Sequence, residues 1–203
     1  MTGCSIDAIR IARVLLGLLT LVAIGNQLSI QIQMGASLIN FFSYFTNLSN
    51  LISAVVLLST AGPRTPSRHL QSLRALSTIN MAVVGIVFAL LLRNEELGLL
   101  RPWINFVLHY LMPCAVVLDW LLQPPTIRLG LRNLPAWLVF PTAYLAYTLV
   151  RGGVTGWYPY PFLNPQRIGG YAGVAAYAGC ITVLFVLVGW TVMIAARRLP
   201  RYP

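Results

Sequence analysis

Six runs of apolar residues, each long enough to cross a lipid bilayer, constrain this chain more than any other feature of its sequence. A transmembrane helix needs roughly 17–25 mostly apolar residues, and little chain is left between these runs. Only 9% of the residues are charged, where soluble domains average about 25%. We therefore predict an all-α, polytopic membrane protein with one domain over residues 1–203. Its six expected transmembrane helices are Ile9–Leu28, Leu38–Leu58, Ala75–Leu92, Trp103–Leu122, Leu134–Val150 and Ala172–Ala196.

The basic residues are all arginines, and they mark the ends of the expected helices. Because positively charged short loops stay cytoplasmic, this bias predicts that both termini face the cytoplasm. Arginines at helix ends also disfavour a nucleic-acid partner, despite the net charge of +10. The side that holds the termini carries Arg10, Arg13, Arg64, Arg68, Arg74, Arg128, Arg132, Arg197, Arg198 and Arg201, and the other side carries Arg93, Arg101, Arg151 and Arg167.

The N-terminal run has two interpretations, a cleaved signal peptide or an uncleaved first helix. Its length exceeds the roughly 7–15 apolar residues of a signal peptide, and no clear cleavage site follows it, so we favour the uncleaved helix. A chain rich in arginine and free of lysine suggests a bacterial source with a high-GC genome. The expected location is therefore the bacterial inner (plasma) membrane.

The segment FFSYFTNLSN, residues 41–50, places several polar side chains inside the second expected helix. Residues three or four apart share a helix face, so Asn40, Ser43, Asn47 and Asn50 form a stripe, flanked by Thr46. Unpaired polar groups are costly in hydrocarbon, so the stripe must face other helices or a cavity. Hydrogen bonding between helices is the simplest explanation for any single one of these residues.

The fourth expected helix carries two ionisable residues, His109 and Asp119. An ionisable residue within a membrane helix indicates a functional site, although a neutral imidazole bonded to a backbone carbonyl is the competing interpretation. At about 1.5 Å per residue, His109 and Thr46 lie at matching depths, whereas Asp119 lies about 15 Å further along the axis. We expect Asp119 near the cytoplasmic boundary, bound to water or to an arginine such as Arg128. Asn105, one turn before His109, is a candidate to orient the imidazole.

Proline also interrupts this helix. Pro113 has no N–H to donate to the carbonyl of His109, four residues earlier. A bend at this point would open a cavity or improve packing, and the sequence leaves both interpretations open.

The longest segment on the exterior side, residues 151–170, is rich in aromatic residues, glycine and proline. Tyrosine and tryptophan favour the membrane interface, which explains such a segment without a function. Alternatively, the segment forms a lid over a cavity open to the exterior, with Tyr158, Tyr160 and Asn164 as its lining residues.

A hydroxyl beside a neutral imidazole is the minimum for nucleophilic acyl transfer. In this hypothesis His109 takes the proton of Thr46, and the side-chain amides of Asn47 or Asn50 stabilise the oxyanion. Composition does not separate Thr46 from the neighbouring Ser43 and Ser49. No cofactor is expected. A metal centre is disfavoured because the chain has only two histidines and no cysteine pair at zinc-like spacing.

The Phe-Thr-Asn-x-x-Asn segment at Phe45–Asn50, HYLMPCAVVLDWLL at residues 109–122 and YPYPFLN at residues 158–164 resemble one particular family. It comprises the androgen-induced and androgen-dependent integral membrane hydrolases, with their bacterial six-helix relatives. The resemblance implies hydrolysis of fatty acid esters of hydroxy fatty acids, or of related acyl lipids, by a membrane-embedded Thr and His. The matching positions are Thr46 and His109.

Two other classes of function stay open: a non-catalytic membrane scaffold or lipid-binding protein, and a small-molecule transporter. A transporter would favour internal repeats and helices broken near the midplane, and we find no repeat and no inverted pair of broken helices. The expected partner is a lipid or an acyl ester from the bilayer. The sequence determines neither its acyl-chain length nor the oligomeric state of the protein.

Overall fold

The computed structural model describes residues 3–62, 64–96 and 98–199, and every regular element in these residues is a helix. The all-α prediction is therefore confirmed for this part of the chain. Arg201, one of the arginines counted above, lies outside the described residues. The α-helices are α1 (Gly3–Gln33), α2 (Leu38–Phe42), α3 (Phe45–Thr60), α4 (Arg68–Val87), α5 (Pro102–Phe106), α6 (Met112–Leu122), α7 (Leu134–Thr155) and α8 (Tyr171–Arg198).

Shorter helical turns join or extend these helices. Two π-helical turns occur in the described residues: Phe88–Leu92, which follows α4, and Val107–Leu111, which lies between α5 and α6. The helices α5 and α6 therefore run on from one another through a π-helical turn. Two 3₁₀ turns, Leu131–Asn133 and Pro161–Leu163, lie in the connections that lead into and out of α7.

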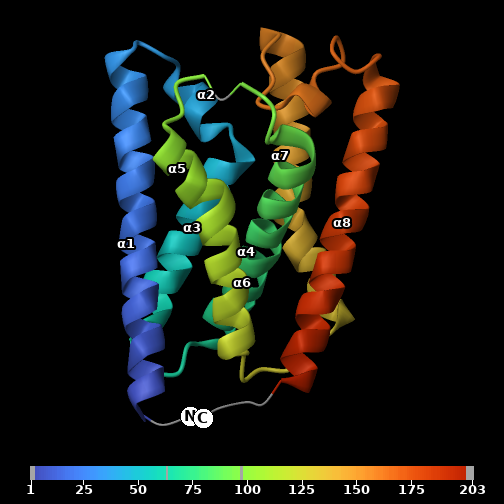
Figure 1. Cartoon of the computed structure of the whole chain (residues 1–203). Coiled ribbons are helices and arrows are strands. Elements are labelled where there is room, and N and C mark those ends of the chain that lie inside the picture. The colour runs from blue at the N-terminus through green and yellow to red at the C-terminus, as the bar shows by residue number, and fades with distance from the viewer. Residues whose placement is uncertain (1–2, 63, 97, 200–203) are drawn as a thin grey trace.

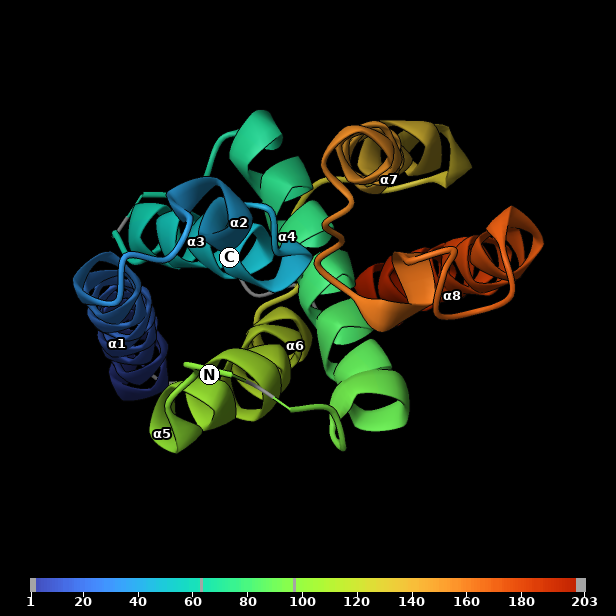
Figure 2. The ribbon, with the colours of Figure 1, turned by 90° about the horizontal axis from the view of Figure 1, so that it is seen from above.

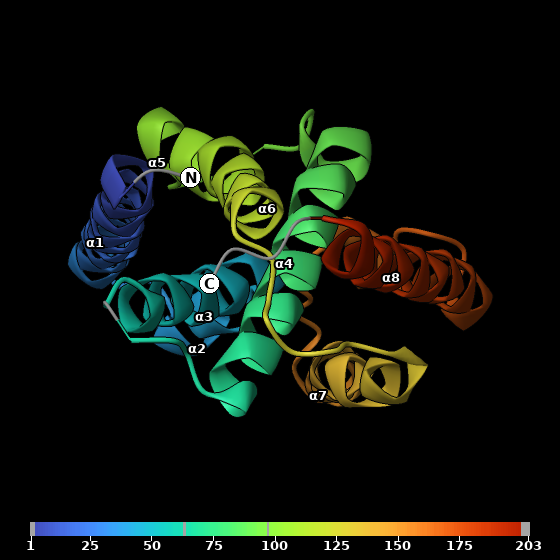
Figure 3. The same cartoon turned by 90° about the horizontal axis from the view of Figure 1, so that it is seen from below.

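Successive long helices run in alternating directions (Figure 1). The helix α4 lies in the middle, with α1, α3, α5 and α6 to one side and α7 and α8 to the other, as the views from above and below both show (Figure 2, Figure 3). We call the end of the bundle where α1 begins and α8 ends the terminal end. The helices α3 and α6 also end there, whereas α2, α5 and the α7–α8 connection lie at the opposite end (Figure 1).

Four helical segments are long and apolar enough to cross a membrane: Ile6–Gln33, Arg68–Leu92, Pro102–Leu122 and Tyr171–Arg198. The apolar helix α3 is shorter, with 16 residues. Each of the four segments overlaps one of the expected spans. The protein therefore has the helices of a membrane protein, while the count of six spans stays a prediction.

The second expected span is not one continuous helix. It is divided into α2 and α3 by Ser43 and by Tyr44, whose backbone is extended at φ −80° and ψ 124°. The hydroxyl of Tyr144 on α7 donates to the Ser43 carbonyl at 2.8 Å and accepts from the Phe45 N–H at 3.2 Å. Because side chains distant in sequence satisfy the freed backbone groups, the break costs little in an apolar setting. Local sequence contains no signal for such partners.

The interruption expected at Pro113 takes the form of a π-helical turn. The N–H of Met112 donates to the Val107 carbonyl, five residues earlier. This wider turn absorbs the missing proline donor. The ring of Pro113 packs against α4 at Gly85, where a Cβ atom would lie 2.9 Å from the proline Cβ.

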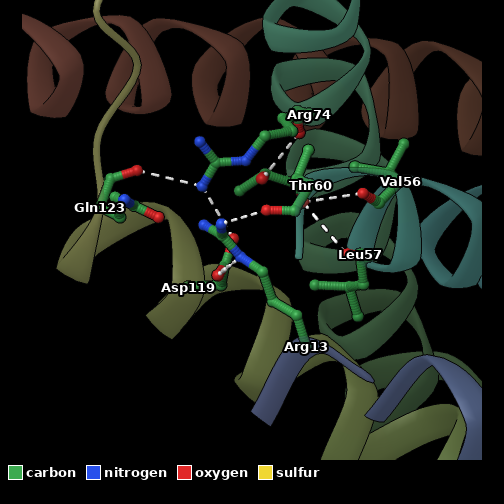
Figure 4. Close-up of polar contacts among 8 residues, drawn as sticks. Arg13, Val56, Leu57, Thr60, Arg74, Asp119 and Gln123 are labelled. Carbon is green, nitrogen blue, oxygen red and sulfur yellow. Dashed lines mark hydrogen bonds and ion pairs between the residues drawn. The ribbon is translucent and has the colours of Figure 1, made fainter. Parts of the chain in front are cut away.

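Near the terminal end, one carboxylate binds two arginines (Figure 4). Asp119 Oδ1 lies 2.6 Å from Arg13 Nε, and Asp119 Oδ2 lies 2.8 Å from Arg74 Nη2. Asp119 thus pairs with arginine as expected, but its partners are Arg13 and Arg74 and not Arg128, the arginine given as an example. Arg13 and Arg74 come from helices that tertiary packing brings to α6, whereas Arg128 is near only in sequence.

The two guanidinium groups also bind carbonyls at helix ends. Arg13 Nη1 donates to the carbonyl of Thr60, the last residue of α3, at 2.9 Å, and Arg74 Nη2 donates to the Gln123 carbonyl after α6 at 3.0 Å. Helix C-termini carry partial negative charge, which offsets the second buried cation. We call Arg13, Asp119 and Arg74 the Arg–Asp–Arg cluster. Its ion pairs and hydrogen bonds link α1, α3, α4 and α6.

Candidate active site

Thr46 occupies the first turn of α3, directly after the break between α2 and α3. Its side chain is buried, and its hydroxyl Oγ1 lies 3.4 Å from the hydroxyl of Tyr160. The backbone N–H of Thr46 also donates to the Tyr160 hydroxyl, at 3.2 Å. The break thus places a hydroxyl at a helix N-terminus, where the helix dipole stabilises negative charge.

His109 lies in the π-helical turn before Pro113, and its ring stacks on Phe88 with 4.1 Å between the ring centroids. Its Nδ1 atom is 3.2 Å from the carbonyl oxygen of Asn105. A carbonyl oxygen only accepts hydrogen bonds, so Nδ1 carries the hydrogen. In the neutral ring Nε2 therefore holds the free lone pair, as a general base requires.

Thr46 and His109 both line one cavity of about 500 Å³ at the end of the bundle opposite the terminal end. Its wall comes from α1, α2, the start of α3, the two π-helical turns, the α4–α5 connection and the α7–α8 connection. The cavity is lined by aromatic residues and by polar and charged residues, and the charged ones include Glu95, Glu96 and Arg167.

The three residues predicted as lid or cavity-lining residues, Tyr158, Tyr160 and Asn164, all line this cavity. They belong to the α7–α8 connection, whose prolines and 3₁₀ turn carry the chain over the end of α3. The ring of Tyr160 stacks on Phe162 at 5.2 Å between centroids. Burial raises the pKa of Tyr160 to about 12, so its hydroxyl keeps its hydrogen at neutral pH.

The three asparagines predicted to assist the reaction have different environments. Asn47 lines the cavity and uses one amide hydrogen, donated to the Phe41 carbonyl at 2.8 Å. Its second amide hydrogen is available for a ligand. Asn50 instead donates both of its amide hydrogens, one to the Thr46 carbonyl at 2.9 Å and one to the Leu108 carbonyl at 3.2 Å.

Asn50 therefore joins α3 to the π-helical turn and has no amide hydrogen left for an oxyanion. Asn105, the candidate to orient the imidazole, contacts His109 through its backbone carbonyl. Its Oδ1 is buried without a hydrogen-bond partner. Of the three residues, only Asn47 both faces the cavity and retains a free donor.

In the described residues, no hydrogen bond joins Thr46 to His109 directly. The Thr46 hydroxyl contacts the Tyr160 hydroxyl, and His109 Nδ1 contacts the Asn105 carbonyl. Thr46 and His109 share the cavity that a ligand would enter. Catalytic contacts are often long before substrate binds and shorten in the complex. The arrangement suits proton transfer between a hydroxyl, a bound substrate and a neutral imidazole.

Two site residues were not anticipated from the sequence in their observed roles. Tyr144 holds the helix break open, and Phe88 stacks on His109. Phe88 also begins a π-helical turn. Neither role has a local signal, because each depends on which helix packs opposite. In the described part of the chain, no three His, Cys, Asp or Glu residues come together as metal ligands would.

Comparison with known proteins gives one match. A family model described as FAR-17a/AIG1-like protein matches residues 14–194, which is the androgen-induced family that the sequence resembles. No curated protein and no solved structure matches the chain. The match spans both Thr46 and His109.

Proposed function

The chain belongs to the FAR-17a/AIG1-like family, and from this premise we propose that it is an intramembrane hydrolase of lipid esters. Thr46 is the nucleophile and His109 the general base. The observation that supports the proposal is the shared cavity, whose lining includes the Thr46 hydroxyl and the His109 imidazole, with the lone pair on Nε2. Fatty acid esters of hydroxy fatty acids, with related acyl lipids, are the proposed substrates.

The first step forms an acyl-enzyme. Thr46 Oγ1 attacks the ester carbonyl while His109 Nε2 takes the hydroxyl proton. The carbonyl carbon forms a bond to Oγ1 and loses its bond to the alcohol oxygen, which receives the proton from His109. In the second step water attacks the same carbon while His109 Nε2 takes a proton from the water. The bond between this carbon and Thr46 Oγ1 then breaks, His109 returns the proton to Oγ1, and the fatty acid leaves.

Two donors in the cavity suit the negative oxygen of the tetrahedral intermediate. One is the free amide hydrogen of Asn47, and the other is the hydroxyl hydrogen of Tyr160. The Tyr160 hydroxyl accepts from the Thr46 N–H, so its own hydrogen can turn toward an oxyanion. Donors of this kind stabilise a transition state by about 3–4 kcal/mol each. Asn50 is left out of this role because its donors are used.

We further propose six membrane spans, with α2 and α3 forming one of them, and cytoplasmic termini. Arginine placement supports this orientation, since Arg13 and Arg74 lie near the terminal end and most other arginines flank it. The cavity would then open toward the exterior. A bacterial inner membrane is the proposed location.

The direct test compares the purified wild-type protein with Thr46→Ala and His109→Ala, in ester hydrolysis and in labelling by a fluorophosphonate probe. We expect each variant to lose hydrolysis by about 10³-fold or more, and Thr46→Ser to retain labelling. Ser49→Ala is the matched control, because Ser49 is fully buried one turn away and does not line the cavity. Labelling that persists in Thr46→Ala would reject Thr46 as the nucleophile.

The break between α2 and α3 resembles the discontinuous helices of transporters, in which unwound backbone binds ions. Here Tyr144 already occupies the Ser43 carbonyl and the Phe45 N–H. These backbone groups are therefore already hydrogen-bonded within the protein, and we favour hydrolysis over transport. Substrate-dependent flux in proteoliposomes that survives in Thr46→Ala would reverse this choice.

A further inference from the structure

A second, smaller pocket lies on the other side of Thr46, among α3, α4, α7 and α8. Its volume is about 110 Å³, and its wall is almost entirely apolar. Phe45, Val83, Leu145 and Phe185 are typical of its lining residues. No step of the reaction described above uses this pocket.

Three residues line both the apolar pocket and the polar cavity: Thr46, Leu92 and Tyr160. Thr46 and Tyr160 are hydrogen-bonded to each other, so their side chains form part of the wall between the two spaces. A group bonded to Thr46 Oγ1 therefore has an apolar space on one side and a polar space on the other. His109 and Asn47 line only the polar cavity.

The apolar pocket reaches the outer surface between α7 and α8. Thr142 on α7 and Thr182 on α8 both line the pocket and are both solvent-exposed in the bundle. The views along the bundle show α7 and α8 as separate helices on the flank away from α1 (Figure 2, Figure 3). In a membrane this flank faces acyl chains, because α8 is one of the segments long and apolar enough to span it.

From this geometry, and resting on the proposed hydrolase function, we propose that the apolar pocket is the acyl-chain subsite. The chain on the carbonyl side of the ester enters from the bilayer between α7 and α8 and lies in this pocket. The alcohol portion of the same ester occupies the polar cavity. Hydrolysis then releases the alcohol beside His109, where water enters for the second step, while the acyl chain stays in the pocket.

The pocket volume limits what it holds. An apolar cavity of about 150 Å³ is filled by one benzene molecule, so 110 Å³ holds only the first few carbons after the carbonyl. The rest of the chain must pass through the opening into the bilayer. We therefore expect a linear acyl chain to be accepted without a sharp upper limit of length, and a bulky branch beside the carbonyl to be rejected.

Ala178→Trp tests this assignment, because Ala178 lines the pocket on α8 and a large ring there fills the space. The readout is the ratio of kcat/KM for a palmitoyl ester to kcat/KM for the acetyl ester of the same alcohol. We expect the ratio to fall by about tenfold or more, since a poorly placed chain loses transition-state binding. Ala176→Trp, on an exposed position of α8 outside the pocket, is the control and should keep the wild-type ratio.

An unchanged ratio in Ala178→Trp would overturn the subsite while leaving the hydrolase proposal intact. Loss of hydrolysis of both esters in that variant would point to misfolding, and photo-crosslinking of the wild-type protein then decides. The probe is palmitate with a diazirine close to its carboxylate, in lipid nanodiscs.

We expect labelling at pocket residues such as Leu145 and Phe185, reduced by excess palmitate. Labelling confined to outward residues such as Val139 and Val183, which are 64% and 58% exposed, would overturn the subsite. This result does not depend on hydrolysis, so it is separate from the Thr46→Ala test. Hydrolysis that survives Thr46→Ala would instead refute the proposed function.

Discussion

At the residue scale, the hydroxyl of Tyr160 connects several parts of the site. It accepts from the Thr46 N–H, lies 3.4 Å from Thr46 Oγ1, and stands between the polar cavity and the apolar pocket. The ring itself is held by stacking on Phe162. The hydroxyl and the ring can therefore be tested separately, because phenylalanine retains the ring.

Tyr160→Phe should lower kcat for ester hydrolysis by about 10²-fold, the usual effect of removing one oxyanion donor, with a smaller change in KM. Since the pKa of Tyr160 is raised to about 12, the hydroxyl stays protonated over the accessible pH range. The ratio of wild-type to variant kcat should therefore stay constant between about pH 7 and about pH 10.

The matched control for this experiment is Tyr158→Phe. Tyr158 also lines the polar cavity but does not line the apolar pocket, and we expect little change in kcat. An equal loss of kcat in both variants would show that any change in the α7–α8 connection lowers activity. Tyr160 would then not be a specific oxyanion donor.

At the scale of helices, both segments that carry the proposed catalytic pair are irregular. Thr46 follows a break with extended backbone, and His109 lies in a π-helical turn. A regular α-helix satisfies its own backbone groups, whereas a break needs partners from elsewhere and a π-helical turn shifts the bond by one residue within the helix. Tyr144 supplies them at the break, and the Val107 carbonyl accepts the displaced bond in the turn. Irregular turns of this kind are frequent at functional sites.

Removing the carboxylate from the Arg–Asp–Arg cluster should destabilise the protein, because two buried arginines then lose their counter-charge. Asp119→Asn removes the carboxylate that binds both Arg13 and Arg74, which are 3% and 4% exposed. Breaking a buried ion pair by removing one partner costs about 3–5 kcal/mol. We expect a clearly lower Tm in nanodiscs, measured by intrinsic fluorescence.

Asp7→Asn is the control for this measurement. Asp7 pairs with Arg10 on α1, but its side chain is 67% exposed, and exposed pairs contribute little. A Tm of Asp119→Asn as high as that of Asp7→Asn would mean that the helix C-termini alone neutralise the two arginines.

At the scale of the whole molecule, the charged cluster and the proposed site lie toward opposite ends of the bundle. The α3 helix connects them, with Thr46 in its first turn and the Thr60 carbonyl at its last residue. The structure thus separates a polar anchor near the terminal end from a cavity at the other end. If the termini are cytoplasmic, the cavity faces the exterior.

Cysteine labelling in intact cells tests this orientation. In a cysteine-free background, Gln166→Cys in the α7–α8 connection should react with a membrane-impermeant maleimide added outside. Thr65→Cys, in the α3–α4 connection, should react only after lysis. Both positions are exposed. Reaction of Thr65→Cys in intact cells would invert the topology and place the cavity on the cytoplasmic side.

The sequence alone predicted the helical membrane class and the family, and some of the residues that it singled out, such as Thr46, Asn47 and His109, line the cavity. Hydrophobic run length and side-chain chemistry carry this information, because each is a property of a single segment. It also indicated that Pro113 would disturb the helix near His109, since the missing N–H of proline is a local fact. The structure has four helices that are long and apolar enough to cross a membrane. The number of six spans and the orientation of the termini stay predictions.

Tertiary structure decided which groups meet. The break before Thr46 exists because Tyr144, about a hundred residues later, binds the freed backbone groups. Asp119 binds Arg13 and Arg74 instead of Arg128 because helix packing, and not distance along the chain, selects its partners. In the same way Asn50 became a link between helices while Asn47 kept a free donor in the cavity. Each of these outcomes depends on the neighbour across a helix interface, which no single segment specifies.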